Sequence, residues 1–419
     1  MTIYNNIPQG YKQTELGIIP EDWEVISIKE RGCLVKDGIN PMLSPNVSFW
    51  EYSMPAFDNG KQPTLSLGEE MHSNRTIIRD TVLLFNKLNV RQQRVWFVES
   101  PSVDSVCSME FLPYVSKSIN LEFLYHYLKT DVVTDYFNGI SKGTSNSQKR
   151  ITPQDFLDYK VILPPIAEQR AIAEALSDVD GLIAALDKKI AKKRLLKQGT
   201  MQQLLTGKIR LPGFTDEWVE KKLGNIGYTY SGLTGKGKED FGRGNAKYVT
   251  FLNVLSNPIL KEELFESVAV SETEHQNKAN FGDLFFNTSS ETPEDVGTCA
   301  VLLSHQNNLY LNSFCFGYRL TDNNILGLYL AYFFRSNTGR QLMTALAQGA
   351  TRYNLSKELF NFSYITLPNT LKEQQAIATI LSDMDKEIAD LEAQRDKYRL
   401  LKSGMMQKLL TGQIRLKNE

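Results

Sequence analysis

A long stretch that occurs twice constrains this chain more than any other feature. Residues 166–211 read IAEQRAIAEALSDVDGLIAALDKKIAKKRLLKQGTMQQLLTGKIRL, and residues 371–416 read LKEQQAIATILSDMDKEIADLEAQRDKYRLLKSGMMQKLLTGQIRL. Leu176 matches Leu381, and the register holds without a gap to the end of both stretches. A repeat with this period predicts two modules of one architecture.

Apolar residues recur in each copy with the spacing of a coiled-coil seam, in which two positions of every seven are buried. The seam positions are Ile172, Leu176, Val179, Ile183, Leu186 and Ile190 in the first copy and Ile377, Leu381, Met384, Ile388 and Leu391 in the second. We therefore predict two long helices that pair with each other. Gly207 and Gly412 follow them at the place of a left-handed C-cap.

The charge along each copy changes from acidic to basic. In the first copy Asp178 and Asp180 precede a run of lysines that ends with Lys197, and the second copy repeats this order. Antiparallel pairing sets each acidic half beside the other basic half, whereas parallel pairing sets like charges together. Basic residues near a helix C-terminus are also favoured by the helix dipole alone. We nevertheless expect antiparallel pairing.

The segments before the two helices predict a mixed α/β (α+β) fold that is used twice. In each, short apolar runs alternate with polar loops, an amphipathic helix follows, and a small-residue loop precedes a final strand. Leu124 matches Leu330, and Gly143 matches Gly349. The expected division is a domain at 1–165, a helix at 166–212, a domain at 213–370 and a helix at 371–419. Antiparallel helices would relate the two domains by an approximate two-fold axis.

The composition argues against several classes of function. With 419 residues, 42% of them hydrophobic and 23% charged, the chain is typical of a globular protein of two or more domains. The net charge of −1 argues against non-specific coating of nucleic acid, although it leaves room for local basic grooves. The chain has no secretory signal, no membrane-spanning run and no CxxC pair among its four cysteines. We expect a cytoplasmic protein with reduced thiols and no membrane partner.

No catalytic set is recognised. The NPPY and DPPY tetrapeptides of amino-methyltransferases are missing, and the four histidines lack metal-ligand spacing. Residues 232–238, GLTGKGK, fit the start of a P-loop but are followed by Glu239, which cannot supply the Mg²⁺-binding hydroxyl. We expect a non-catalytic chain that holds no metal and no cofactor.

At this point the chain resembles the specificity subunit of type I restriction–modification systems. The resemblance covers essentially the whole sequence and rests on LPPIAEQRAIAEALSDVD…LLTGKIRL and LPNTLKEQQAIATILSDMD…LLTGQIRL, each after a variable domain. It implies that each domain recognises one half of a split, asymmetric site in double-stranded DNA. It also implies that the helices set the spacer and dock two methyltransferase subunits, with translocase–nuclease subunits outside them. S-adenosylmethionine, ATP and Mg²⁺ would then belong to partner subunits only.

Candidate DNA contacts are basic and small polar residues in loops, because phosphates are bound by Lys, Arg and hydroxyl groups and base edges by Arg, Lys, Asn, Gln, Ser and Thr. The candidates are Asn86, Lys87, Arg91, Gln93 and Arg94, then Lys142, Thr144, Ser145, Lys149 and Arg150 in the first domain, and Lys236, Lys238, Arg243, Lys247, Thr288, Ser289, Thr351, Arg352 and Tyr353 in the second. The alternative to DNA reading is a degenerate specificity-like scaffold that binds partner subunits only. A stand-alone enzyme comes third.

Overall fold

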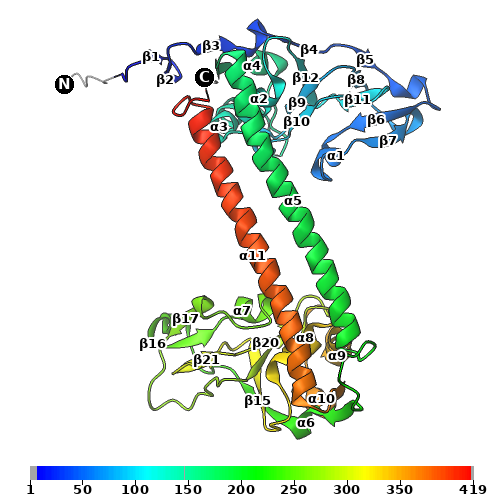
Figure 1. Ribbon diagram of the computed structural model, residues 1–419, viewed down its shortest axis with the longest axis vertical. Helices are drawn as coiled ribbons and strands as arrows, with labels where there is room; N and C mark the ends of the chain where they lie inside the picture. Colours follow the sequence, from blue (N-terminus) through cyan, green and yellow to red (C-terminus); the bar gives the residue numbers. More distant parts are fainter. Residues whose placement is uncertain (1–6, 146, 417–419) are drawn as a thin grey trace. The chain divides into compact units, whose positions relative to one another are not determined.

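The computed structural model describes residues 7–145 and 147–416, and the chain forms two compact units (Figure 1). Unit 1 combines the chain up to Leu186 with the chain from Gln394, and unit 2 is the stretch Asp187–Ala393. Each of the two predicted helical segments therefore contributes one part to each unit. A globular domain of strands and shorter helices completes each unit.

The domain of unit 1 is built on two sheets, with strand orders β10-β9-β12-β4 and β5-β8-β11-β6-β7, and on the strand pairs β1-β2 and β13-β3. All pairs are antiparallel except β11 with β6. The strands are β1 (Tyr11–Thr14), β2 (Gly17–Pro20), β3 (Glu24–Ser27), β4 (Cys33–Leu34), β5 (Gly38–Ile39), β6 (Ser48–Tyr52), β7 (Thr64–Leu67), β8 (Arg75–Ile77), β9 (Val82–Asn86), β10 (Val95–Val98), β11 (Ser105–Ser108), β12 (Phe111–Val115) and β13 (Lys160–Leu163).

Short helices cover the first of these sheets. They are α1 (Met54–Asp58), α2 (Leu121–Leu128), α3 (Asp131–Ile140) and α4 (Pro153–Leu157), with the 3₁₀ turns η1 (Ile28–Glu30), η2 (Pro41–Leu43), η3 (Gly68–Glu70) and η4 (Val90–Gln92). The Asn120 side chain begins α2 by accepting a 2.7 Å hydrogen bond from the Phe123 amide. In the core, the Phe85 ring of β9 lies 5.1 Å from that of Phe137 and 4.9 Å from that of Phe156. The helices α2, α3 and α4 thus share one apolar core with one face of the sheet, and α1 packs in a second core with Trp96 and Leu84.

The domain of unit 2 contains sheets of order β15-β22-β18-β20, β17-β16-β21 and β19-β24-β23, and the pair β14-β25. The strands are β14 (Val219–Lys222), β15 (Gly227–Ser231), β16 (Phe241–Val249), β17 (Phe265–Val268), β18 (Leu284–Asn287), β19 (Ser289–Ser290), β20 (Cys299–Val301), β21 (Leu309–Leu311), β22 (Cys315–Leu320), β23 (Ala347–Gln348), β24 (Tyr353–Leu355) and β25 (Tyr364–Leu367). The helices are α6 (Leu223–Ile226), α7 (Phe251–Ser256), α8 (Gly327–Arg335), α9 (Asn337–Leu346) and α10 (Lys357–Phe362), with η5 (Lys238–Asp240) and η6 (Glu262–Leu264).

The two domains share one strand order. Read as β4-β12-β9-β10, the four-stranded sheet of unit 1 takes its strands in the chain order first, last, second, third, and β15-β22-β18-β20 of unit 2 does the same. In both units two consecutive helices follow the last strand, and a short helix and one more strand lead into a long helix. The prediction of one mixed α/β fold used twice is therefore confirmed.

Within each unit, parts of the two long helices pair antiparallel. These helices are α5 (Ile166–Leu204) and α11 (Leu371–Leu409). In unit 1, the ammonium group of Lys402 in α11 lies 2.6 Å from both carboxylate oxygens of Asp180 in α5. In unit 2, Lys193 of α5 donates a 2.7 Å hydrogen bond to Glu387 of α11. Acidic first halves thus face basic second halves, as the charge pattern predicts.

Most of the seam residues are buried. Buried are Ile172, Leu176, Val179, Ile190, Ile377, Leu381, Ile388 and Leu391, and half-buried are Ile183, Leu186 and Met384. Ile172 and Leu176 belong to the apolar core of unit 1 and Ile377 and Leu381 to that of unit 2. The start of each helix is therefore anchored in the domain that precedes it.

A tryptophan, a glutamate and an arginine fix the start of each long helix. We call these sets clasp 1 (Trp23, Glu168, Arg415) and clasp 2 (Trp218, Glu373, Arg210). In clasp 1, the indole N–H of Trp23 donates a 3.0 Å hydrogen bond to Glu168, and Arg415 donates two of 2.7 Å to the same carboxylate. In clasp 2 the arginine bonds measure 2.6 and 2.8 Å, and the indole bond 3.4 Å. Both copies of the repeat end in LLTGxIRL because the arginine of this ending binds the glutamate at the start of the other long helix.

The structure also explains why a glycine and a glutamine recur in both copies of the repeat. Gly207 and Gly412 have φ of 69° and 73°, the left-handed conformation predicted for them. A Cβ atom on Gly412 would lie 2.5 Å from Pro20 Cδ. The glutamine after each clasp glutamate accepts a backbone hydrogen bond from the preceding domain, Gln169 from Asn120 at 2.9 Å and Gln374 from Leu326 at 2.8 Å.

Candidate nucleic-acid interface

In unit 1, two loops far apart in the sequence are joined by backbone hydrogen bonds. The Asn89 amide donates to the carbonyl of Lys149 at 2.8 Å, and the Ile151 amide donates to that of Lys87 at 3.1 Å. Isolated antiparallel bridges also pair Arg150 with Leu88 and Lys142. The loops at 86–94 and 141–150 therefore form one continuous polar ridge, which we call ridge 1. Asn146, within the second loop, lies outside the described residues.

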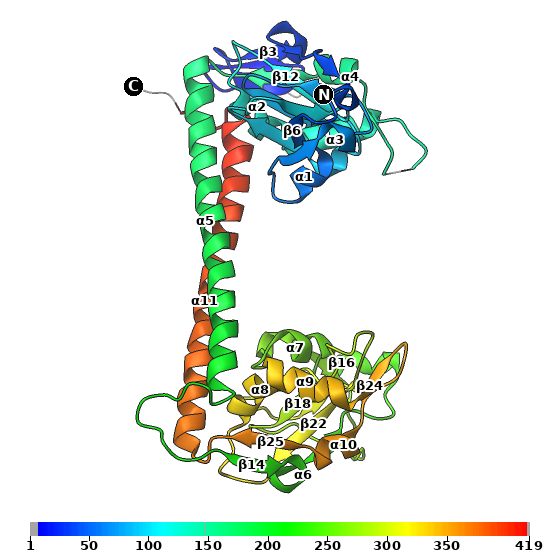
Figure 2. The same cartoon turned by 90° about the vertical axis from the view of Figure 1, so that its right-hand side faces the viewer.

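Unit 2 contains a corresponding ridge (Figure 2). Here Ser289 pairs with Asn354 and Ser290 with Tyr353, so β19 and β24 are neighbours, and β23 lies on the other side of β24. The amide of Leu355 also donates a 2.9 Å hydrogen bond to the carbonyl of Thr288. The loops at 287–290 and 350–354, which sequence reasoning singled out separately, thus form one surface, ridge 2.

A glycine closes the second loop of each ridge. A Cβ atom on Gly349, which has φ of 133°, would lie 2.1 Å from the carbonyl oxygen of Arg352. On Gly143 it would lie 2.9 Å from the carbonyl oxygen of Gln148. No other residue fits either position without moving the backbone. Gly143 and Gly349 therefore match in sequence because the second loop has the same construction in both units.

Several candidate side chains of ridge 1 are held by the protein itself. Arg94 donates two 2.8 Å hydrogen bonds to Asp58, which lowers the pKa of that carboxyl group. Arg150 binds Glu110 through bonds of 3.1 and 3.2 Å, which raises the pKa of the guanidinium group. Gln93 donates to Thr134 at 2.9 Å. These contacts fix the ridge on the domain.

Other side chains of ridge 1 face outward. Lys142, Thr144 and Ser145 are exposed, and Lys87 and Lys149 are half-buried. Among the described residues no carboxylate lies within ion-pair distance of Lys87, Lys142 or Lys149. Arg91 is exposed as well. Ridge 1 therefore offers several cations and hydroxyl groups to a polyanion.

Asn86 is instead buried at 3% exposure, at the end of the apolar strand β9. Neither polar atom of its amide has a partner among the described residues. Asn287, at the same place in unit 2, is also buried, but its Oδ1 accepts from the Thr298 amide and its Nδ2 donates to the Asp295 carbonyl at 3.0 Å. Both asparagines end a central strand, so burial overrides the surface position expected for Asn86.

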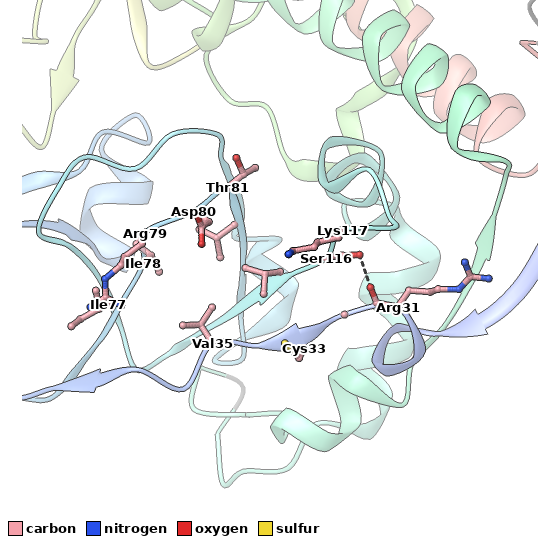
Figure 3. A pocket seen from close by; sticks show the side chains of 13 residues that line it. Arg31, Cys33, Val35, Ile77, Ile78, Arg79, Asp80, Thr81, Ser116 and Lys117 are labelled. Carbon is pink, nitrogen blue, oxygen red and sulfur yellow. Dashed lines mark hydrogen bonds between the residues drawn. The ribbon is translucent and has the colours of Figure 1, made fainter.

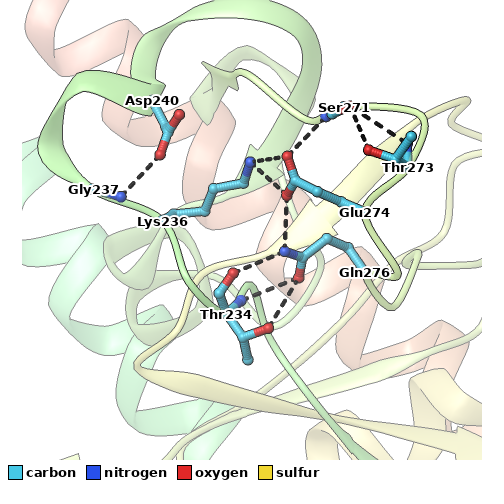
Figure 4. Close-up of polar contacts among 8 residues, drawn as sticks. All are labelled: Thr234, Lys236, Gly237, Asp240, Ser271, Thr273, Glu274 and Gln276. Atoms are coloured by element: carbon cyan, nitrogen blue, oxygen red, sulfur yellow. Dashed lines mark hydrogen bonds and ion pairs between the residues drawn. The ribbon is translucent and has the colours of Figure 1, made fainter.

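Lys236 is likewise not a free cation. Its side chain is 6% exposed, and its ammonium group lies 2.6 Å from Glu274 (Figure 4). Lys236, the Ser271 amide and Gln276 together lower the pKa of Glu274 to about 2. The side chain of Gln276 in turn holds both backbone polar groups of Thr234. The Gly-Lys segment is thus clamped to the loop at 271–277.

The remaining candidates of unit 2 fall into two groups. Thr351 and Arg352 are exposed and Thr288, Ser289 and Tyr353 are half-buried, and all five lie on ridge 2. Lys238, Arg243 and Lys247 are exposed on η5 and β16, which belong to a different sheet from β19 and β24. The structure therefore joins the first group and leaves the second group on a separate surface.

A groove of about 750 Å³ in unit 1 carries cations that the sequence did not single out (Figure 3). Arg31, Arg79 and Lys117 line it, but Arg31 lies 2.7 Å from Glu24 and Arg79 contacts Asp37. Of these three cations only Lys117 lacks a carboxylate partner among the described residues, and Asp80 also lines the groove, so the groove carries no excess of positive charge.

Sequence reasoning also missed two features on the surface. One is a set of exposed leucines on α5 and α11, and the other is a contact of two lysines with Tyr125. The described part of the chain contains no group of three or more His, Cys, Asp or Glu side chains arranged to hold a metal ion. In residues 7–145 and 147–416, no helix is long and apolar enough to span a membrane.

The family profile and the similar proteins all belong to type I restriction systems. The family profile described as "Type I restriction modification DNA specificity domain" matches residues 94–193 and 215–398, together more than half of the chain. The putative type I restriction enzyme MjaX specificity subunit of Methanocaldococcus jannaschii is 26% identical, over 98% of this chain and 97% of its own. The EcoKI specificity subunit of Escherichia coli K12 is 26% identical over 61% of this chain and 56% of its own.

Solved structures resemble the fold. The type I restriction–modification S subunit from M. genitalium has a TM-score of 0.58 at 13% identity, over 98% of both chains. A chain from a study of assembly and conformational transition of the type I R-M system has a TM-score of 0.57 at 19% identity, over 94% of this chain and 99% of its own.

Proposed function

Because this chain belongs to the type I restriction–modification DNA specificity family, as a non-catalytic specificity subunit, we propose that it reads a bipartite, asymmetric sequence in double-stranded DNA. Ridge 1 would read one half-site and ridge 2 the other. A chromosomal or incoming DNA ligand also implies a cytoplasmic location.

The observation that carries this proposal is the construction of the ridges. In each unit two loops that are separated in sequence converge after the same core strand, and a conformationally required glycine closes the second loop. A rigid scaffold that presents two polar loops side by side is suited to base reading, because side chains must be held at fixed positions against a groove.

The two ridges differ in chemistry, which supports an asymmetric site. Ridge 1 offers lysines, the exposed Arg91 and hydroxyl groups, whereas ridge 2 offers Arg352, Tyr353 and several Ser and Thr side chains. An arginine that reaches a base edge favours guanine, since its two donors match O6 and N7. We therefore expect Arg352 to contact a guanine in the half-site of ridge 2.

The helices would have two roles, setting the number of unread base pairs and docking partners. Apolar side chains are exposed at matching positions of both helices. This match suggests that the two helices bind two copies of the same partner. The exposed fractions are 69% for Leu195 and 54% for Leu196, against 76% for Leu400 and 50% for Leu401. Exposed leucine pairs of this kind indicate protein contacts. We propose that each pair docks one methyltransferase subunit, with translocase–nuclease subunits outside, and that S-adenosylmethionine, ATP and Mg²⁺ are bound by those partners.

The test is to map methylated positions in DNA modified by complexes that contain single variants of this chain. Arg352→Ala should relax or abolish one half of the modified sequence and leave the other half and the spacer unchanged. Lys142→Ala together with Thr144→Ala should affect the opposite half. Glu69→Ala, at an exposed position of η3 that belongs to neither ridge, serves as the control.

A continuous modified motif, or a change in both halves from one variant, would contradict the assignment of one ridge to each half-site. If the assembled complex enriched no sequence from a random duplex library, the scaffold alternative would be supported instead.

A further inference from the structure

Two lysines in unit 1 converge on one phenol oxygen. The ammonium groups of Lys61 and Lys129 lie 3.0 and 3.2 Å from Oη of Tyr125. Both also lie over its ring, at 5.2 and 4.9 Å from the centroid. All three side chains are half-buried. We call this set the lysine–tyrosine cluster.

The backbone is specially bent to place Lys61 there. Gly60 and Lys61, directly after α1, have φ of 87° and 56°, and Lys61 is one of few non-glycine residues with positive φ. Its amide donates a 3.0 Å hydrogen bond to the Phe57 carbonyl, which ends the turn. A non-glycine residue held in this conformation costs free energy, and such residues are concentrated at functional sites.

The cluster contains donors without an acceptor. Among the described residues, neither ammonium group has a carboxylate partner, and the hydroxyl proton of Tyr125 has no acceptor. Because both ammonium groups contact one oxygen, they are close enough to repel each other. Burial on its own raises the pKa of Tyr125, but Lys129 and Lys61 outweigh it and hold that pKa below its usual value. An oxyanion would accept from all three groups and relieve the repulsion.

The neighbouring charges do not supply that anion. Lys402, on the adjacent helix α11, is already paired with Asp180. His126 is fully buried, and burial, with a contribution from Lys402, lowers its pKa to about 3, so the imidazole is neutral. Neither neighbour therefore supplies an anion to the cluster.

The cluster adjoins ridge 1. Lys61 follows α1, whose last residue Asp58 holds Arg94, and Lys129 precedes α3, whose first residue Asp131 accepts a 3.2 Å hydrogen bond from Gln93. Each lysine is thus close in sequence to an acidic residue, Asp58 or Asp131, that holds one loop of the ridge. A DNA backbone that lies against ridge 1 passes close to the cluster.

Unit 2 has no such site among its described residues. At the matching positions it has Ala331 in place of Tyr125 and Arg335 in place of Lys129. The guanidinium group of Arg335 is turned inward, where it donates to the backbone carbonyls of Val254, Leu255 and Asn257 at 2.6 to 3.0 Å. Its hydrogen-bonding capacity is used within the domain.

We propose that the lysine–tyrosine cluster binds one phosphate of the DNA backbone beside the half-site of ridge 1, and that the other half-site has no equivalent contact. The proposal rests on the proposed function for the ligand, but it concerns a contact that anchors DNA without reading its sequence.

The test measures the DNA affinity of the complete complex, assembled with its methyltransferase subunits, over a range of salt concentrations. Each phosphate that is neutralised adds about 0.9 to the slope of log affinity against log salt. The double variant Lys61→Ala/Lys129→Ala should reduce the steepness by about that amount, and each single variant by no more than that, because each keeps one ammonium group on the same phosphate. Affinity should fall by the same factor for specific and random duplexes, with the methylated sequence unchanged.

Two further variants keep the test decisive. Tyr125→Phe retains both charges and the ring, so the slope should stay and affinity at fixed salt should fall about threefold to tenfold. Lys222, which lies 4.2 Å from the centroid of Phe362 in unit 2 and has no carboxylate partner among the described residues, provides the matched control Lys222→Ala. Ethylation of single phosphates should weaken the native complex at one phosphate near the ridge 1 half-site, and the double variant should be insensitive there.

Unchanged slopes in all lysine variants, with sequence-specific binding intact, would refute the phosphate contact and leave the proposed function standing. Loss of methyltransferase assembly instead of DNA affinity would refute it too and indicate an acidic side chain of a partner as the anion. A native complex that bound all duplexes equally would refute the proposed function, while the slopes would still report on the cluster.

Discussion

Arg415 donates two hydrogen bonds of 2.7 Å to Glu168, across 247 positions of the chain. The carboxylate is 4% exposed and also accepts from the indole of Trp23. Burial on its own raises the pKa of Glu168, but Arg415 and Trp23 outweigh it, and the pKa lies below its usual value. The group is therefore charged, and its charge is balanced only because the chain returns with an arginine.

Removing that arginine should destabilise unit 1. Arg415→Ala leaves a buried carboxylate without its counter-charge, and we expect a loss of about 2–4 kcal/mol, less than for a fully buried pair because Arg415 is partly exposed. Arg415→Lys should recover part of the loss, since an ammonium group restores charge but not the two-pronged geometry. Urea unfolding measures both.

The control for this prediction is Lys29→Ala, which breaks an exposed pair with Asp158 and should change stability little. Arg210→Ala tests clasp 2 and should act in the same direction as Arg415→Ala. If Arg415→Ala proved no more harmful than Lys29→Ala, the clasp would not be a stabilising contact.

His126 should make unit 1 sensitive to mild acid. Its pKa in the folded protein is about 3, because burial disfavours the charged ring, whereas the unfolded chain binds the proton near pH 6.5. Because the pKa of His126 is lower in the folded protein than in the unfolded chain, protons favour the unfolded chain. The free energy of unfolding therefore keeps its full value above pH 6.5 and decreases as the pH falls from 6.5 toward 3. At pH 5.5 the loss amounts to about 1.4 kcal/mol.

Replacing this histidine should flatten the pH profile. His126→Gln cannot take up a proton, so the difference in unfolding free energy between pH 7.5 and 5.5 should shrink by about 1.4 kcal/mol. His275→Gln, at an exposed position of unit 2, is the matched control for the loss of a histidine outside the core. Equal profiles for the native chain and His126→Gln would count against a neutral buried imidazole.

Gly349 should be irreplaceable for the reading of one half-site. Alanine there is strained by its positive φ and by the 2.1 Å approach to the Arg352 carbonyl, so Gly349→Ala should cost about 1–3 kcal/mol and displace ridge 2. Methylation mapping should show one half-site lost or relaxed. Gly404→Ala, in the helix α11 with open space around the added Cβ, should stabilise by about 0.5–1 kcal/mol and leave the recognised sequence unchanged.

The matching exposed leucines predict the stoichiometry of assembly. Leu195→Asp should remove one methyltransferase subunit and Leu400→Asp the other, since each places a charge in one of two equivalent apolar contacts. Native mass spectrometry would then show one bound copy for each single variant and none for the double variant. Leu182→Asp is the control, because Leu182 is 48% exposed but is matched by Glu387 in the second copy. Retention of two copies by both single variants would place the docking surface elsewhere.

The helices were the most predictable part of the molecule. Their heptads fix which side chains are buried, and the acidic-to-basic gradient fixes the direction of pairing, because both act over many residues at known spacing. The clasps were not predictable in detail. Trp23, Glu168 and Arg415 each stand in a repeated motif, but no local rule states that they meet.

The binding surfaces were less predictable, because exposure of a single loop residue depends on contacts that are distant in sequence. Lys236 has the composition of a phosphate-binding loop, yet Glu274 neutralises it from 38 positions away. Asn86 is the last residue of the apolar strand β9 and shares the burial of that strand. Lys61 and Tyr125 carry no spacing signal, although the alignment of Lys129 with Arg335 marks a basic position shared by both domains.

Clasp 1 also affects the order in which the two units can be completed during synthesis. A ribosome adds roughly 5–20 residues each second, so Glu168 emerges about 12–50 s before the arginine that balances it. Unit 2 is one uninterrupted stretch of chain and has all of its parts while unit 1 still waits for the segment from Gln394, which holds the last part of α11 and the closing arginine. The domain that is translated first is thus the one that matures last, and a transcript cut short near its 3′ end would damage the beginning of the protein.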